Sequence, residues 1–163
     1  MVSHRLIAIL MILGLVAAGC GWKPPAGPPP TPDACTDSDG PSPETVKQAI
    51  AVLAAPPGSA WTETASGNTG DCRLYWVQVS PDNATESSPQ QVLFFDGNTA
   101  LGTPTPNAKP YITVLSSGDD TLVIQYQWQV GDEAPCCPTG IGTARFQLGA
   151  DGTLKALDPI PNQ

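Results

Sequence analysis

The stretch from Thr121 to Val130 is the feature that most constrains the fold of this 163-residue chain. Apolar and mainly polar residues alternate here over ten consecutive positions. The apolar set is Leu122, Ile124, Tyr126, Trp128 and Val130. A period of two is typical of a β-strand with one buried and one wet side, as found in antiparallel sheets. The pattern therefore predicts a long strand in an antiparallel sheet.

Other β-branched and aromatic runs bring the expected total to six or seven strands. Two hairpin turn signals, Asp96-Gly97 and Asp151-Gly152, lie between such runs. The expected strands are residues 72–79, 91–95, 99–101, 111–115, 121–130, 145–148 and 153–157. The candidate aromatic core is Trp76, Phe94, Tyr126, Trp128 and Phe146.

One amphipathic helix is expected over residues 44–54. Ser42-Pro43-Glu44 has the residue types that begin helices, and Pro56-Pro57-Gly58 ends the pattern. The apolar stripe is Val46, Ala49, Ile50 and Leu53. Because strands and helices do not alternate along the chain, we expect an α+β fold. In it, an antiparallel sheet of six or seven strands carries one N-terminal amphipathic helix packed on it, braced by disulfides.

The N-terminus has the form of an export signal. Arg5 precedes an apolar run, and small residues then lead to Cys20, a pattern that resembles the bacterial lipobox. We therefore expect residues 1–19 to be a lipoprotein signal peptide, and Cys20 to be acylated. The alternative is an ordinary signal peptide with an incidental cysteine. Residues 20–34 are proline-rich and predict an extended tether, so that residues 35–163 form a single globular domain.

Composition excludes several function classes. A chain beginning at Cys20 has six Lys and Arg against fifteen Asp and Glu, a formal net charge of −9. Such a surface does not suit a nucleic-acid phosphate backbone. The one histidine, His4, lies in the predicted signal peptide. The exported part therefore has no histidine with which to form a Ser-His-Asp or Cys-His site.

Four cysteines remain in the domain: Cys35, Cys72, Cys136 and Cys137. An even number in an exported domain predicts disulfides rather than a redox or metal site. A bond between the adjacent Cys136 and Cys137 would strain the intervening peptide, so we expect each to pair elsewhere. The sequence leaves the pairing open; we favour Cys72–Cys137 with Cys35–Cys136.

Paired carboxylates are the one conventional catalytic arrangement left. The candidate pairs are Asp119 with Asp120 and Asp132 with Glu133 in predicted turns, and Asp37 with Asp39 in the N-terminal segment. All lie where solvated acids are common. We therefore expect no catalytic residues, no metal and no cofactor.

Several short motifs recur in a fixed order from about residue 40 to the end. They are Trp61, Cys72-x-Leu74-x-Trp76-Val77, Gln91 to Phe95, Val123-x-x-Tyr126-x-Trp128, Cys137-Pro138, Arg145-Phe146 and Leu157 to Pro161. Together they resemble the mycobacterial LppP/LprE lipoprotein family. The resemblance implies an exported, lipid-anchored envelope protein of unassigned activity, with no catalytic residues to transfer.

The leading hypothesis is a non-enzymatic lipoprotein on the extracytoplasmic side of the cell membrane. It would be held by a palmitate-type anchor and would bind an envelope protein, glycan or lipid. The alternative is a small lipid or glycolipid carrier, which needs an apolar cavity. A hydrolase that uses carboxylates alone is the least favoured function.

Overall fold

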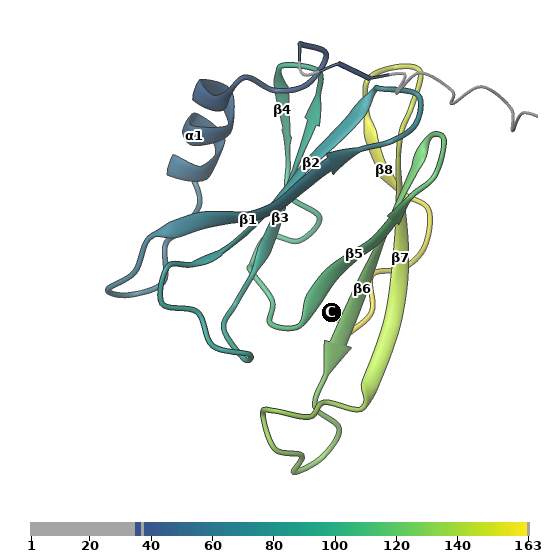
Figure 1. The fold of residues 1–163 in the computed structure, drawn as a ribbon. Helices are drawn as coiled ribbons and strands as arrows, with labels where there is room; N and C mark the ends of the chain where they lie inside the picture. Colours follow the sequence, from purple (N-terminus) through teal and green to yellow (C-terminus); the bar gives the residue numbers. More distant parts are fainter. Residues whose placement is uncertain (1–34, 37, 163) are drawn as a thin grey trace, which may run out of the picture. The chain divides into compact units, whose positions relative to one another are not determined.

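A computed structural model describes residues 35–36 and 38–162. They form eight strands in two antiparallel sheets of four, each with its strands in chain order. Sheet 1 contains β1 (Trp61–Asn68), β2 (Leu74–Pro81), β3 (Gln91–Asp96) and β4 (Thr99–Gly102). Sheet 2 contains β5 (Ile112–Ser117), β6 (Thr121–Trp128), β7 (Gly140–Leu148) and β8 (Leu154–Ala156). Figure 1 shows both groups of strands.

The expected α+β fold, one sheet of six or seven strands with a helix on it, is wrong. Turn signals reveal which strands form hairpins, but they do not reveal where one sheet ends and another begins. That break falls at residues 103–111, which carry the chain from β4 to β5. The missed strand is β1, whose sequence WTETASGN is mainly exposed and lacks apolar alternation. It is an edge strand that pairs with β2 alone.

The two sheets share one core between their facing sides. Leu74, Val92 and Phe94 from sheet 1 meet buried residues of β5, β6 and β7. The rings of Phe94 and Phe146 lie with their centroids 5.2 Å apart, and both residues are almost fully buried. Of the expected aromatic core, Trp76 and Trp128 remain partly exposed.

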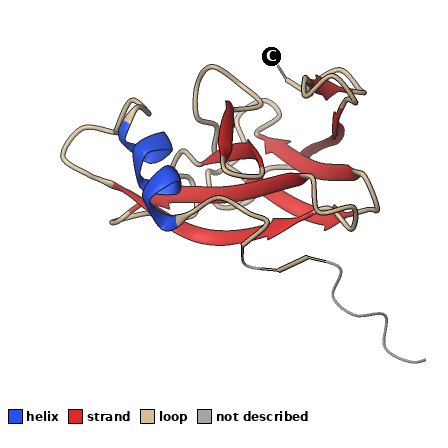
Figure 2. Ribbon diagram, turned by 90° about the horizontal axis from the view of Figure 1, so that it is seen from above, coloured by secondary structure: helices blue, strands red, loops and turns tan. Residues whose placement is uncertain are grey.

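The outer face of sheet 1 is covered by helix α1 (Pro43–Ala51), as Figure 2 shows from above. The Ser42 hydroxyl caps the helix by accepting a hydrogen bond from the Thr45 amide at 3.2 Å. Val46 and Ala49 pack against β2 and β3 in a second apolar cluster. The helix ends three residues earlier than expected, and Val52, just beyond it, is 84% exposed.

All four domain cysteines are in disulfides, but the expected pairing, Cys72–Cys137 with Cys35–Cys136, is wrong. The structure joins Cys35 to Cys72 and Cys136 to Cys137. Cys35 lies against the hairpin between β1 and β2, where Cys72 is in the turn. The adjacent pair bonds within the loop between β6 and β7, against our expectation that strain would prevent it.

Three sequence predictions fall outside the described residues: the signal peptide 1–19, the tether 20–34 and acylation at Cys20. They stay predictions, as does the boundary of the 35–163 domain. No helix in the part of the chain that the structure describes is long and apolar enough to cross a bilayer.

Candidate functional site

A pocket lies on the outer face of sheet 1, beside the N-terminal arm, which we define as residues 35–36 and 38–42. We call it the arm pocket, and its volume is about 580 Å³. Ligand sites typically measure roughly 300–1,000 Å³. The arm and helix contribute Cys35, Thr36, Gly40, Pro41, Pro43 and Val46, and strands β1 and β2 contribute Glu63, Ser66, Gly67, Asn68, Tyr75, Trp76 and Val77.

The register of β1 and β2 places one set of lining side chains on a common face. Tyr75 pairs with Asn68, and Val77 pairs with Ser66. Because side chains alternate along a strand, these four point to the same side of the sheet. Tyr75 and Val77 belong to the cluster that packs under α1, so this is the outer side. The pocket therefore has an apolar side on β2 and a polar side on β1.

Gly40 lets the arm approach Tyr75 closely. A Cβ atom at Gly40 would lie 2.8 Å from Cδ1 and Cε1 of the Tyr75 ring, which is closer than real Cβ contacts allow. Any larger residue would push the arm or the ring aside. The observed wall of the pocket therefore requires glycine at position 40.

The Tyr75 hydroxyl is buried and has no hydrogen-bond partner within the described residues. Burial raises the pKa of Tyr75 above its usual value, and the nearby Asp39 and Asp71 carboxylates raise it further. The hydroxyl is therefore neutral at physiological pH and keeps its proton to donate. A buried donor without a partner is energetically costly, so it favours a ligand or water that accepts from it.

The arm is held on the sheet by more than its disulfide. The Asn68 side-chain amide donates to the Cys35 sulfur at 3.0 Å and to the Thr69 carbonyl at 2.9 Å. Within the arm, the amide and hydroxyl of Thr36 both donate to Asp39 at 2.8 Å. These two hydrogen bonds lower the pKa of Asp39. The arm is thus a defined turn fixed to β1.

Of the carboxylates weighed for catalysis, Asp39 lies in the arm and Asp37 falls outside the described residues. The other four lie at opposite ends of β6. Asp119 and Asp120 are in the turn before it, and Asp132 and Glu133 are in the loop after it. Eight strand residues span about 26 Å at the usual rise. Carboxylate pairs that cleave glycosides are roughly 5–10 Å apart. The fold therefore does not bring the two pairs together.

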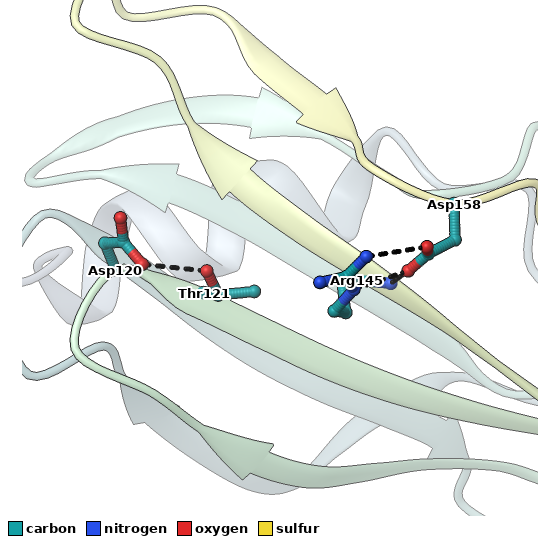
Figure 3. A network of polar contacts seen from close by, with 4 residues as sticks. All are labelled: Asp120, Thr121, Arg145 and Asp158. Carbon is teal, nitrogen blue, oxygen red and sulfur yellow. Dashed lines mark hydrogen bonds and ion pairs between the residues drawn. The ribbon is translucent and has the colours of Figure 1, made fainter.

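Asp120 and Glu133 instead accept hydrogen bonds that fix local structure. Asp120 accepts from Thr121 at 2.8 Å, drawn in Figure 3, and from Gln147 at 2.6 Å; both bonds lower its pKa. The Thr139 hydroxyl and the amides of Val130 and Thr139 lower the pKa of Glu133. Each carboxylate closes a turn or loop.

Figure 3 also shows an ion pair that the sequence did not predict, between Arg145 on β7 and Asp158. The guanidinium donates to both carboxylate oxygens, at 2.8 and 2.9 Å, and the Arg145 amide donates at 3.0 Å. These hydrogen bonds lower the pKa of Asp158 to about 2. The pair fastens the C-terminal segment to sheet 2.

Sequence reasoning missed the arm pocket because its residues match no catalytic or metal-binding motif. One usable signal is the run Gln91 to Phe95, which is buried on both faces of β3 and so predicts that both faces of its sheet are covered. Over the residues that the structure describes, no three His, Cys, Asp or Glu side chains are grouped so as to hold a metal ion.

Comparisons with a family model and with curated proteins point to the same family. The family model described as LppP/LprE lipoprotein matches residues 66–151, from within β1 to the turn before β8. Proteins named "Putative lipoprotein LppP" from Mycobacterium bovis and Mycobacterium tuberculosis are 58% identical over 153 residues, covering 93% of this chain and 87% of theirs. No solved structure matches significantly. The chain therefore belongs to the LppP/LprE family of lipoproteins.

Proposed function

We propose that this protein is a lipid-anchored envelope lipoprotein whose exported domain binds another envelope component and catalyses no reaction. The arm pocket is the observation that carries this proposal. It combines a volume suited to a ligand with the buried Tyr75 hydroxyl, for which the described residues offer no hydrogen-bond partner. The separation of the carboxylate pairs along β6 supports a binding role over a hydrolytic one.

The anchor is acylated Cys20 on the extracytoplasmic side of the membrane, after removal of residues 1–19. Membership of a lipoprotein family supports this anchor. Two or more acyl chains would give stable attachment. Cys35 lies fifteen positions after Cys20, so the chain can place the arm no farther than about 50 Å from the acylated residue.

The packing beneath α1 supports binding over lipid carriage. Val79, Leu93 and Phe95 are at most 3% exposed where they meet the helix. The core between the sheets is likewise filled by large buried side chains. A carrier of lipid or glycolipid needs an apolar cavity at one of these interfaces.

The anchor is tested by growing cells with labelled palmitate and comparing the wild type with Cys20→Ala. We expect the wild type to take up label and to partition into detergent, and the variant to lose both properties. An unlabelled wild-type protein would overturn the proposed anchor. Native mass spectrometry of the extracted wild type covers the alternative, because stoichiometric bound lipid would favour a carrier.

The binding site is tested with a photo-crosslinking amino acid at Ser66, which is exposed and lines the arm pocket. Thr62 is the matched control, because it is exposed on the same strand but does not line the pocket. We expect one defined envelope component to crosslink from Ser66 and not from Thr62. Equal crosslinking at both positions, or at neither, would contradict the proposed site.

A further inference from the structure

A second pocket lies at the far end of β6 from the turn that holds Asp119. We call it the C-terminal pocket, because the segment at Pro161 and Asn162 forms one wall. Its volume is about 290 Å³, near the lower end of the range for small-ligand sites. The other walls come from Lys109, Pro110 and Tyr111, and from residues 126–129 at the end of β6 and the start of the loop that follows.

The walls combine flat rings with polar groups. Trp128 lies opposite Gly140 on β7, and a Cβ atom at Gly140 would come within 2.6 Å of Cδ1 of the indole. The indole therefore lies directly on the β7 backbone with one face, while the residue stays partly exposed. The Tyr111 hydroxyl donates to the Pro135 carbonyl, which fixes a second ring beside the pocket.

The Tyr126 hydroxyl is buried without a hydrogen-bond partner among the described residues, and Tyr126 is only 2% exposed. Burial raises its pKa far above the usual value. The phenol is thus neutral, and it has a proton to donate. An unpaired hydroxyl in a core is unfavourable unless a ligand or water accepts from it.

The charged group of the pocket also suits a ligand rich in oxygen atoms. Lys109 is the one charged side chain among the lining residues that the structure describes, and its ammonium donates to the Asn162 carbonyl at 2.8 Å. An ammonium has three protons, so it can donate further bonds. Gln127 and Gln129 also line the pocket, and the side-chain amide of Gln129 donates to the Glu133 carbonyl.

We propose that the C-terminal pocket binds a single ring of a saccharide. A sugar ring has an apolar C–H face that stacks on an aromatic ring such as that of Trp128. Its edge carries hydroxyl oxygens that accept from the Tyr126 phenol and the Lys109 ammonium. This site is separate from the arm pocket, and its ligand does not depend on what the arm pocket binds.

The test is saturation-transfer NMR on the full-length protein in detergent, with methyl glycosides of glucose, mannose, galactose and N-acetylglucosamine as probes. We expect at least one glycoside to bind with a dissociation constant in the millimolar range or tighter. Tyr126→Phe should weaken that binding about three- to tenfold, because it removes one hydrogen bond. Lys109→Ala, a change at a partly exposed side chain, should weaken it similarly.

Tyr75→Phe is the matched control, because it removes another buried, unpaired hydroxyl in the arm pocket. Both Phe variants should unfold at the wild-type temperature or higher, since neither hydroxyl has a hydrogen-bond partner among the described residues. Sugar affinity should fall only for Tyr126→Phe. Failure of every glycoside to bind, or equal losses in both Phe variants, would overturn the proposal.

A synthetic peptide of residues 21–33 is a competing probe, because proline-rich peptides also bind aromatic-lined grooves. If that peptide binds, if its affinity falls in Tyr126→Phe and if no glycoside binds, the saccharide assignment is wrong.

Discussion

The two sheets have the same number of strands and the same order, yet their central strands are buried differently. In β3 of sheet 1, the consecutive residues Val92, Leu93, Phe94 and Phe95 are at most 3% exposed. In β6 of sheet 2, buried residues alternate with partly exposed ones. Sheet 1 has the common core on one face and α1 on the other, whereas the outward-facing residues of β6 and β7, such as Val123, Gln125 and Arg145, are partly or fully exposed.

This difference shows that strand sequences indicate whether one face or both faces of a sheet are buried. A strand covered on both faces needs an unbroken apolar run, and one covered on a single face needs a period of two. The arm and α1 cover only sheet 1, and the arm pocket forms where that covering meets the exposed edge strand β1. The unequal covering of the two sheets therefore accounts for the position of the candidate site.

Alanine substitutions at neighbouring positions of the two strands should give the largest effects. Phe94→Ala and Phe95→Ala should each lower the free energy of unfolding by about 3–5 kcal/mol, because each removes a buried ring from a different face. On β6, Ile124→Ala should cost about 2–5 kcal/mol, whereas Val123→Ala should cost under about 1 kcal/mol. Denaturant unfolding measures all four. Equal losses at Ile124 and Val123 would contradict one-sided covering of sheet 2.

The two disulfides should differ nearly as much in how strongly their removal destabilises the fold. The Cys35–Cys72 bond closes a sequence separation of 37 residues and so stabilises the fold by up to about 4 kcal/mol in the chain-entropy model. Cys136–Cys137 links neighbours and restricts almost no loop. Replacing both members of each pair by serine, followed by thermal unfolding, should strongly destabilise only the Cys35–Cys72 variant. Comparable losses would show that the arm is not held as described.

Removing the cap of α1, the helix that covers sheet 1, should have an intermediate effect on stability. Ser42→Ala removes the acceptor for the Thr45 amide and should lower the free energy of unfolding by about 1 kcal/mol. The side-chain oxygen Oδ1 of Asn98 remains, and it accepts from the Ser42 amide at 2.8 Å and from the Thr45 hydroxyl at 2.7 Å. Circular dichroism during denaturation checks the change. Glu44→Ala serves as the milder control, because the Glu44 carboxylate accepts a hydrogen bond from the exposed Gln48 side chain.

The Arg145–Asp158 pair on sheet 2 should have the smallest effect, and it should depend on pH. The folded-state pKa of Asp158 is lowered to about 2. The contribution of its carboxylate to the free energy of unfolding is therefore fully present above the unfolded pKa of about 3.9. It is lost as pH falls through the folded value. Asp158→Asn should therefore make the melting temperature less sensitive to pH below about 4. Unchanged acid sensitivity would contradict the ion pair.

The sequence predicted the individual strands, turns and helix better than it predicted how the strands are arranged into sheets. Alternation located β6, and Asp96-Gly97 located the turn between β3 and β4, because such signals depend on neighbouring residues. Ser42 located the start of α1 for the same reason. The division into two sheets depends on which distant strands pair, which short-range patterns do not determine. β1 was missed because an exposed edge strand needs no apolar residues.

The candidate sites were harder to predict than the strands. The arm pocket requires Gly40 to lie against Tyr75, a contact across 35 residues of sequence. The hydroxyls of Tyr75 and Tyr126 have no hydrogen-bond partner in the described part of the chain, which becomes apparent only once their surroundings are known. The disulfide pairing failed because it was inferred from peptide strain, without knowing that the arm returns to the β1–β2 turn.

Disulfide mapping of the unreduced protein tests the central claim most directly, because the arm must be attached at Cys72 for the arm pocket to exist. Trypsin cuts after Lys47 and Arg73 and, because prolines follow Lys23 and Lys109, next after Arg145. The account predicts that peptide 48–73 is linked to the peptide ending at Lys47, while peptide 74–145 is linked to neither. A crosslink between peptide 74–145 and either of the others would contradict it.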